Sequence, residues 1–301
     1  NDNNIDIEQL SWAINHNTIL IVGSVPSFPH GLIDDISVLN NVALRRNIPI
    51  HIDACLGGFL TPFINNEDEK YDFRLPGVQS ISSDTHKYGC CPKGSSVLIF
   101  RDKDYFESCY FVQSEWSGGI YATTNITGSR SGLNLAWTWA VLSSLGYEKL
   151  KTNADKISAH IQTIKNAFIN DTDIFIFGDP KVCAIGFGSN TINIYEVCEV
   201  MKHRGWNLNE LQNPASFHLC ITNCHTDEII EKFIGDLKGA ITNVVDGNSE
   251  NITMSIEDSK VVVKKKEEKN KQSASIYGTT QRVPDQSIID YIVRIYLNTL
   301  H

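Results

Sequence analysis

The sequence lacks any apolar run long enough to cross a bilayer, and its first residues, Asn1 to Asn4, lack the apolar core of a signal peptide. It also lacks a surplus of positive charge, since 26 lysine and arginine residues stand against 35 acidic residues and the formal net charge is -9. General nucleic-acid binding needs a concentrated basic surface. We therefore expect a soluble chain that does not bind nucleic acid.

The eight cysteines lack the spacing of a zinc finger or of a small disulfide-rich domain. They are spread along a chain long enough to bury a core, which favours reduced and mostly buried thiols. Cys220 and Cys224 lie between His218 and His225, but no second ligand pair stands at zinc-finger spacing. We expect no metal site.

The first part of the chain alternates strand-like and helix-like segments. Apolar runs predict strands and one amphipathic segment predicts a helix, the strands at 17–24, 49–54, 78–83 and 96–101 and the helix at 34–46. This alternation is typical of a mainly parallel sheet that is covered on both faces. We assign residues 1–150 to this α/β domain.

The second part of the chain has a different pattern. A long helical region from Gly132 to about Ile169 is followed by hairpin-like strands and helices, at 174–177, 182–187, 194–204, 206–211, 217–222 and 227–244. This pattern indicates a smaller α+β domain, formed by 151–245 and 275–301. Residues 246–274 are polar, dense in charge and almost free of aromatic side chains, so they are predicted to be a disordered linker.

Two residues of chemical interest fall at the ends of neighbouring predicted strands. Asp53 ends the strand in HIDACLGGFL, and Lys87 lies just past the strand of residues 78–83. In an α/β sheet, ligands bind at this edge. A solvated loop lysine and a turn-forming aspartate are the commoner explanations of each residue alone. Together they raise a specific alternative, a lysine that forms an imine and an aspartate that pairs with a cofactor's pyridine nitrogen.

Five stretches of the chain, in order, resemble the sphingosine-1-phosphate lyases, which belong to the pyridoxal-phosphate decarboxylase-like group. They are HIDACLGGFL, SISSDTHKYGCCPKGSSVLIF, GGIYATTNITGSRSG, GWNLNELQNPASFHLCIT and SIYGTTQRVPD. The similarity extends from about Asp6 to His301 and is weakest in the predicted linker. It implies a fold-type-I pyridoxal-phosphate transferase architecture, with a partial large domain and a smaller C-terminal domain.

The resemblance also implies roles for residues near the catalytic lysine. Lys87 is expected to form the imine with pyridoxal phosphate, and Asp53 to keep the pyridine nitrogen protonated, so that the ring becomes an electron sink. His86 matches a family residue near the cofactor phosphate, and Lys93 matches a second lysine in the substrate-binding region. Without the resemblance, His86 and Lys93 are equally explained as loop cations.

A Gly-Ser-Arg turn resembles one that reaches the neighbouring subunit's cofactor in the family. Gly128 and Ser129 are therefore expected to contact the phosphate in trans, which implies a homodimer with an active site shared between subunits. Without the family match, this turn is an ordinary start of a helix.

The chain also departs from the family pattern. Cys90 and Cys91 stand where relatives usually carry Tyr-Ala, and Asn125 and Ser131 replace prolines beside the Gly-Ser-Arg turn. The family's main phosphate-binding turn, its stacking histidine and its membrane helix match nothing in these residues. Membrane association, on the cytosolic face of the endoplasmic reticulum, is thus expected only through a segment absent from this chain.

By resemblance, the reaction is a retro-aldol cleavage of sphingosine 1-phosphate to a fatty aldehyde and phosphoethanolamine, a step of sphingolipid catabolism. Two alternatives stay open. An amino-acid decarboxylase of the same group shares Lys87 and Asp53, and a non-catalytic fragment or pseudoenzyme acts only as a dimerisation module.

Overall fold

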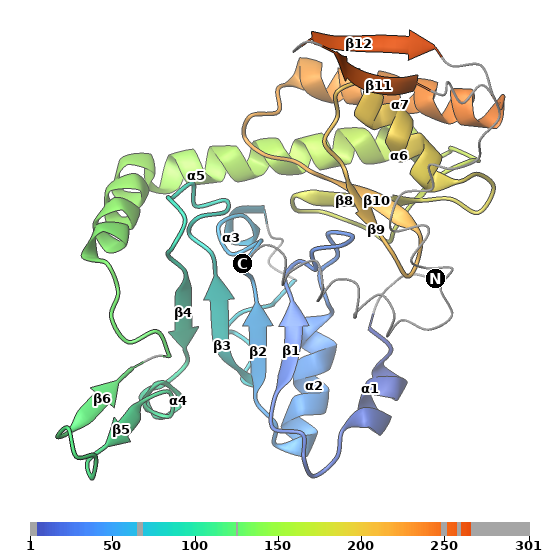
Figure 1. The fold of residues 1–301 in the computed structure, drawn as a ribbon. Coiled ribbons are helices and arrows are strands. Elements are labelled where there is room, and N and C mark those ends of the chain that lie inside the picture. The colour runs from blue at the N-terminus through green and yellow to red at the C-terminus, as the bar shows by residue number, and fades with distance from the viewer. Residues whose placement is uncertain (1–4, 65–68, 125, 248–251, 258–259, 266–301) are drawn as a thin grey trace. The chain divides into compact units, whose positions relative to one another are not determined.

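The computed structural model describes residues 5–64, 69–124, 126–247, 252–257 and 260–265 (Figure 1). It divides into two compact units, and the boundary between them falls inside the long helix α5 (Gly132–Phe168). The first unit extends to Gln162 and also takes in Gly178–Ala184 and Ile221–Cys224, while the second contains the other described residues. The expected limits of 1–150 and 151–245 for the two domains stay predictions.

The first unit is built on a four-stranded sheet in the order β1-β2-β3-β4. Its strands are β1 (Ile21–Ser24), β2 (Ile50–Asp53), β3 (Val78–Ser83) and β4 (Val97–Phe100). The first three strands are parallel, and β4 runs antiparallel to β3. The mainly parallel sheet that the sequence predicted is confirmed.

Helix α2 (Ile36–Arg46) packs its apolar face against this sheet. Asp35 caps its first turn by accepting a hydrogen bond from the Val38 backbone, and Asn47 ends it in the left-handed conformation. Its buried apolar residues recur at the spacing of one helix face, and they join a core cluster with the inward side chains of the strands. The cluster contains Ile21, Val25, Ile36, Leu39, Ala43, Ile50, Ile52, Ala54, Tyr71, Leu75 and Val78.

Several short elements of the first unit were not predicted from the sequence. They are α1 (Ile7–Ala13), α3 (Thr61–Ile64), α4 (Lys103–Glu107) and the antiparallel pair β5 (Phe111–Gln113) and β6 (Tyr121–Thr123). The long helix α5 was expected, but it is interrupted at Gly146, whose φ of 66° and ψ of 177° are not helical. Glycine adopts this conformation without the clash that a Cβ atom would cause.

An exposed apolar segment runs from β4 to the start of α5. All four residues of β4 are apolar, which is typical of a strand buried on both faces, yet Val97, Leu98 and Ile99 are 37%, 52% and 48% exposed. Other large apolar side chains of this segment are also exposed, among them Phe111, Val112, Trp116, Ile120, Tyr121, Leu133, Leu135, Trp137 and Trp139. So much exposed apolar surface is unusual for a monomer.

The second unit has the α+β content expected for the smaller domain. Its sheet follows the order β7-β8-β10-β9, with β7 (Phe175–Ile176), β8 (Ala184–Gly188), β9 (Asn209–Leu211) and β10 (Ser216–Cys220). Its helices are α6 (Ile194–His203) and α7 (Asp227–Val245). Phe187, Phe217 and Phe233 are fully buried and form its centre, with ring centroids 5.3 and 6.1 Å from that of Phe187.

Part of the predicted linker is described. The strands β11 (Ile252–Glu257) and β12 (Lys260–Lys265) pair as an antiparallel ribbon. The other residues from 266 onward, including the predicted part 275–301 of the smaller domain, lie outside the described residues. Within the described ranges, no helix is long and apolar enough to cross a membrane.

Two glycines differ sharply in the room around them, and this gives a stability prediction. A Cβ on Gly57 would lie 2.3 Å from the Val25 carbonyl oxygen, whereas one on Gly235, an exposed residue of α7, would meet nothing within 4 Å. Gly57→Ala should therefore destabilise the chain by about 1–3 kcal/mol, since backbone must move. Gly235→Ala should stabilise it by up to about 1 kcal/mol, because alanine favours a helix.

Urea denaturation of both variants beside the wild-type chain checks this pair. A lower free energy of unfolding in Gly235→Ala would contradict the open helical environment of Gly235. An unchanged free energy of unfolding in Gly57→Ala would contradict the close packing of the loop that follows β2.

Candidate active site

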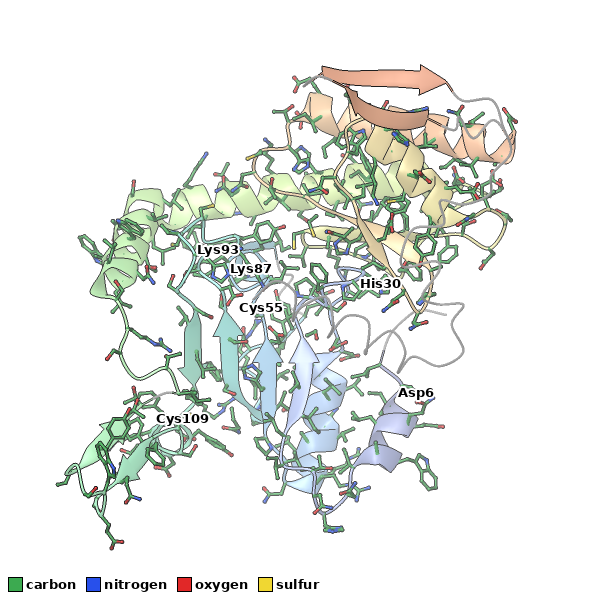
Figure 2. The ribbon with its side chains drawn as sticks, in the orientation of Figure 1. Asp6, His30, Cys55, Lys87, Lys93 and Cys109 are labelled. Atoms are coloured by element: carbon green, nitrogen blue, oxygen red, sulfur yellow. The ribbon has the colours of Figure 1, made fainter. Side chains whose placement is uncertain are left out.

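Two strand ends bring the candidate residues to one edge of the sheet. Asp53 is the last residue of β2 and pairs in register with Ser82 of β3, and Lys87 follows a few residues after β3 ends. Because the carboxyl ends of parallel strands meet at one edge, both side chains are placed there. Figure 2 shows Lys87 and Cys55 just beyond the ends of these strands.

The Asp53 carboxylate is held in its ionised form. The backbone N–H of Cys55 donates to its Oδ1 at 3.0 Å. Burial acts to raise the pKa of Asp53, but hydrogen bonds from Cys55 and the charges of His51 and Lys87 outweigh it and hold the pKa below its usual value. At neutral pH, Asp53 is thus an anion with acceptor capacity left for a cation.

Lys87 is held as a cation by the same neighbourhood. Its Nζ lies 3.0 Å from Oδ2 of Asp84, and its side chain is 33% exposed. Burial acts to lower the pKa of Lys87, while the hydrogen bond to Asp84 and a second one to Cys55 raise it, and the net shift is upward. In the structure, then, the lysine is an ammonium group whose charge is matched by Asp84.

Asp84 is itself fixed by its other oxygen. The Ser96 hydroxyl donates to Oδ1 at 2.7 Å. Burial acts to raise the pKa of Asp84, but the hydrogen bonds from Ser96 and Lys87 and the nearby charges of Lys87 and His86 hold it below the usual value. Both carboxylate oxygens of Asp84 are therefore engaged.

His51 lies two residues before Asp53 and so on the same face of β2. Its two ring nitrogens lie 2.8 Å from the Ser80 hydroxyl and 3.1 Å from the Ser82 hydroxyl. Burial lowers the pKa of His51 below its ordinary value, although the charge of Asp53 acts in the opposite direction. At neutral pH the uncharged His51 ring therefore orders the neighbouring strand, and the charge by which it lowers the pKa of Asp53 is present only at lower pH.

His86 and Lys93 belong to the loop that joins β3 to β4. Nδ1 of His86 lies 2.9 Å from the Ser95 carbonyl oxygen, so this nitrogen carries the proton, and its Nε2 lies 3.8 Å from Oδ2 of Asp84. Lys93 is exposed, and Figure 2 shows it beyond the strand ends together with Lys87. The structure therefore places both residues in the loop that carries Lys87.

Gly128 and Ser129 lie apart from this group in the sequence and are exposed in the loop between β6 and α5. Gly128 has a φ of 60°, which glycine adopts readily. A Cβ atom on Gly128 would lie 3.6 Å from the hydroxyl oxygen of Tyr121, a residue of the preceding strand β6. Their expected role as phosphate contacts, which requires a second subunit, stays a prediction.

Sequence reasoning missed the three neighbours that determine the charge of the site. Asp84 stands three residues before Lys87, and His51 and Cys55 each lie two residues from Asp53, so their spacing was visible but not specific.

The thiols also differ from expectation. All eight cysteines are free, but only Cys91, Cys183 and Cys198 are buried, so the prediction of mostly buried thiols is wrong.

No group of three or more histidine, cysteine, aspartate or glutamate side chains in the described part of the chain could hold a metal ion.

The fold is that of the fold-type-I pyridoxal-phosphate enzymes. It is similar to the solved sphingosine-1-phosphate lyase of Burkholderia pseudomallei K96243, with a TM-score of 0.76 and 37% sequence identity, covering 82% of this chain and 57% of that one. It is also similar to a glutamate decarboxylase of Lactobacillus brevis, with a TM-score of 0.68 and 24% identity, covering 81% of this chain and 60% of that one. The second likeness concerns the fold alone.

The chain belongs to the pyridoxal-dependent decarboxylase family, whose conserved-domain model matches residues 15–189. It is 37% identical to the sphingosine-1-phosphate lyase of Drosophila melanogaster over 301 residues, which are 99% of this chain and 52% of that protein. It is 36% identical to sphingosine-1-phosphate lyase 1 of Mus musculus, over 99% of this chain and 50% of that protein. The chain thus spans about half the length of the curated relatives it matches.

The residues at the sheet edge fit the cofactor of this family. Lys87 supplies a primary amine that can form an imine with the aldehyde group of the cofactor. Asp53 supplies an ionised carboxylate that can pair with the protonated ring nitrogen. The described hydrogen bond to the Asp53 carboxylate comes from the backbone of Cys55, two residues further along the chain. It engages Oδ1, so Oδ2 can accept a hydrogen bond from a protonated ring nitrogen.

Proposed function

We propose that this chain carries the lysine and aspartate of a pyridoxal-phosphate-dependent lyase that cleaves sphingosine 1-phosphate to a fatty aldehyde and phosphoethanolamine. The observation that carries the proposal is the placement of Lys87 and Asp53 at one edge of the sheet. The identity of 36–37% to sphingosine-1-phosphate lyases supports this substrate class.

Each residue has a definite task in this proposal. Lys87 holds the cofactor covalently through its amine, and Asp53 holds the ring nitrogen in its protonated form. The bound cofactor supplies an electron sink for cleavage of a carbon–carbon bond. At a separation of about 4 Å and an effective dielectric constant of about 20, the ion pair that Asp53 makes is worth on the order of 4 kcal/mol.

The other candidate residues are proposed to contact the cofactor phosphate or the substrate. His86 is proposed to lie near the cofactor phosphate, because Ser95 already fixes its ring, and Lys93 is proposed to bind the substrate because its amine is exposed. Gly128 and Ser129 are proposed to reach the phosphate of a second copy. The resemblance to the eukaryotic relatives supports the cytosolic face of the endoplasmic reticulum as the place of action.

An amino-acid decarboxylase is the second candidate, and the family model that matches the chain favours it. Such an enzyme releases carbon dioxide from a carboxylate and does not cleave a phosphorylated base. Incubation with sphingosine 1-phosphate and separately with amino acids, followed by analysis of aldehyde, phosphoethanolamine and carbon dioxide, distinguishes the two activities.

We predict that borohydride reduction in the presence of pyridoxal phosphate attaches the cofactor to Lys87. Lys87 follows the end of β3 at the edge where β2 ends in Asp53, whereas Lys93 lies farther along the loop that joins β3 to β4. Peptide mapping by mass spectrometry identifies the labelled residue. Lys87→Ala, as the control, should take up no label at this edge, and a label on Lys93 in the wild-type chain would overturn the assignment.

We predict that Asp53→Asn slows cleavage by several orders of magnitude while it keeps the fold. Asparagine has nearly the shape of aspartate but lacks the charge that keeps the ring nitrogen protonated. Turnover is measured together with cofactor absorbance and thermal unfolding. Asp72→Asn is a matched control, because Asp72 pairs with the exposed Arg74. Unchanged turnover in Asp53→Asn would refute the electronic role.

We also propose that these 301 residues require further polypeptide for efficient turnover. They span about half the length of their relatives, and the exposed apolar segment between β4 and α5 offers a surface for such a contact. A second copy that contributes Gly128 and Ser129 is part of this proposal.

A fusion tests this requirement. The isolated chain is compared with the same chain joined to the part of the Drosophila relative that lies outside the matched region. We expect turnover to rise on the order of a hundredfold or more, since a misplacement of about 1 Å can cost that much. Equal rates would contradict the proposal, and light scattering of both proteins reports whether dimers form.

A further inference from the structure

Both carboxylate oxygens of Asp84 are engaged by other side chains. Its Oδ2 faces the Lys87 ammonium at 3.0 Å, while its Oδ1 accepts the Ser96 hydroxyl at 2.7 Å. Its side chain is only 18% exposed. A carboxylate that is fixed through one oxygen presents the other in a constant direction, so it is a preorganised acceptor for an ammonium group.

Backbone atoms of Asp84 hold the loop in addition to the contacts of its carboxylate. The backbone N–H of Asp84 donates to the Cys55 carbonyl, and the Asp84 carbonyl accepts from the Lys87 N–H, both at 3.2 Å. These contacts use backbone atoms and would persist with asparagine at position 84. The side chain of Asp84 is thus available for a role that the turn itself does not explain.

We propose that Asp84 is a positioning residue that holds the Lys87 ammonium at the sheet edge whenever this lysine is not covalently engaged, and that it thereby restrains the lysine's nucleophilicity. The role in catalysis rests on the proposed function, since a lysine that is displaced and returns in each cycle needs a defined resting place. The contact itself stands on the geometry alone.

The charges around Lys87 give the direction of the effect. Asp84 from its own loop and Cys55 from the end of β2 hydrogen-bond to it, Asp53 acts on it through its charge, and His86 lies 3.8 Å from the same Asp84 oxygen. Burial acts to lower the pKa of Lys87, and Asp84 is the first of the groups that raise it. Removal of the Asp84 charge therefore lowers this pKa and increases the fraction of neutral, nucleophilic amine at a given pH.

Trace acetylation of the full chain with acetic anhydride measures this fraction without any cofactor. The neutral amine attacks one carbonyl carbon of the anhydride, acetate leaves, and the amine's proton goes to solvent. Labelling over a range of pH is followed by unfolding and complete acetylation with deuterated reagent. Mass spectrometry of the peptide that contains Lys87 then gives its reactivity in the folded chain.

In Asp84→Asn, we expect Lys87 labelling at about pH 8 to rise on the order of tenfold, with the midpoint of its pH profile shifted to lower pH. Asp84→Glu should restore most of the wild-type profile. Ser96→Ala should give a smaller rise, because it frees the carboxylate without removing it. Thermal unfolding of each variant confirms that the fold is kept.

A matched pair elsewhere in the chain controls for general effects of charge. Lys151 lies 2.8 Å from Asp155 on an exposed helix face, and this partner raises its pKa. Asp155→Asn should change the profile of Lys151 and leave that of Lys87 as it is.

Two results would overturn the proposal. One is a Lys87 profile in Asp84→Asn within about twofold of the wild-type profile, well inside the change that an ion pair at this distance produces. The other is a larger rise in Cys55→Ala than in Asp84→Asn, which would assign the restraint to the thiol.

A second measurement separates this proposal from the proposed function. Wild-type chain and Asp84→Asn are incubated with pyridoxal phosphate, reduced with borohydride and mapped. If the wild-type chain takes no cofactor on Lys87 while acetylation still depends on Asp84, the lyase assignment fails and the positioning role stands. If the cofactor labels Lys87 but acetylation does not depend on Asp84, the positioning role fails.

Discussion

The parallel pairing of β2 with β3 is the constraint on which the site depends. It places Asp53 opposite Ser82 and brings the Lys87 loop to the same edge. The pairing is held by the inward side chains Ile50, Ile52 and Val78, which are at most 1% exposed. A slip of one residue along either strand would turn these side chains out of the core. The packing of the core therefore determines where the amine and the carboxylate lie.

The charge at this edge follows from that placement. Two carboxylates, Asp53 and Asp84, have lowered pKa values, and the Lys87 ammonium, which lies 3.0 Å from Asp84, also lowers the pKa of Asp53 through its charge. His51 is kept neutral by burial, so it does not balance the second negative charge. One ammonium group between two partly buried carboxylates leaves uncompensated negative charge, which is costly. This imbalance favours a positively charged group beside Asp53, which a protonated pyridine ring supplies.

The sequence was sufficient for the elements that carry a clear period. The strands around Ile21, Ile50 and Val78 and the helix α2 lie where alternation and amphipathic spacing predicted them. Short elements such as α1, α4 and the β5–β6 pair have too few residues to show a period. Lys87 and Asp53 were found through position and resemblance. Asp84 and Cys55 were not, because their importance arises from contacts between loops that only the folded chain brings together.

The exposed apolar segment connects assembly with the chemistry of the site. Ser96, which fixes the Asp84 carboxylate, directly precedes β4, whose apolar side chains are exposed. Any polypeptide that covers β4 stabilises the folded form by binding it in preference to the unfolded chain. The same contact restricts the start of β4 and hence the Ser96 hydroxyl. Association would then stabilise the Asp84–Lys87 ion pair as well as the fold. Lys87 should therefore be less nucleophilic in the assembled protein than in the isolated chain.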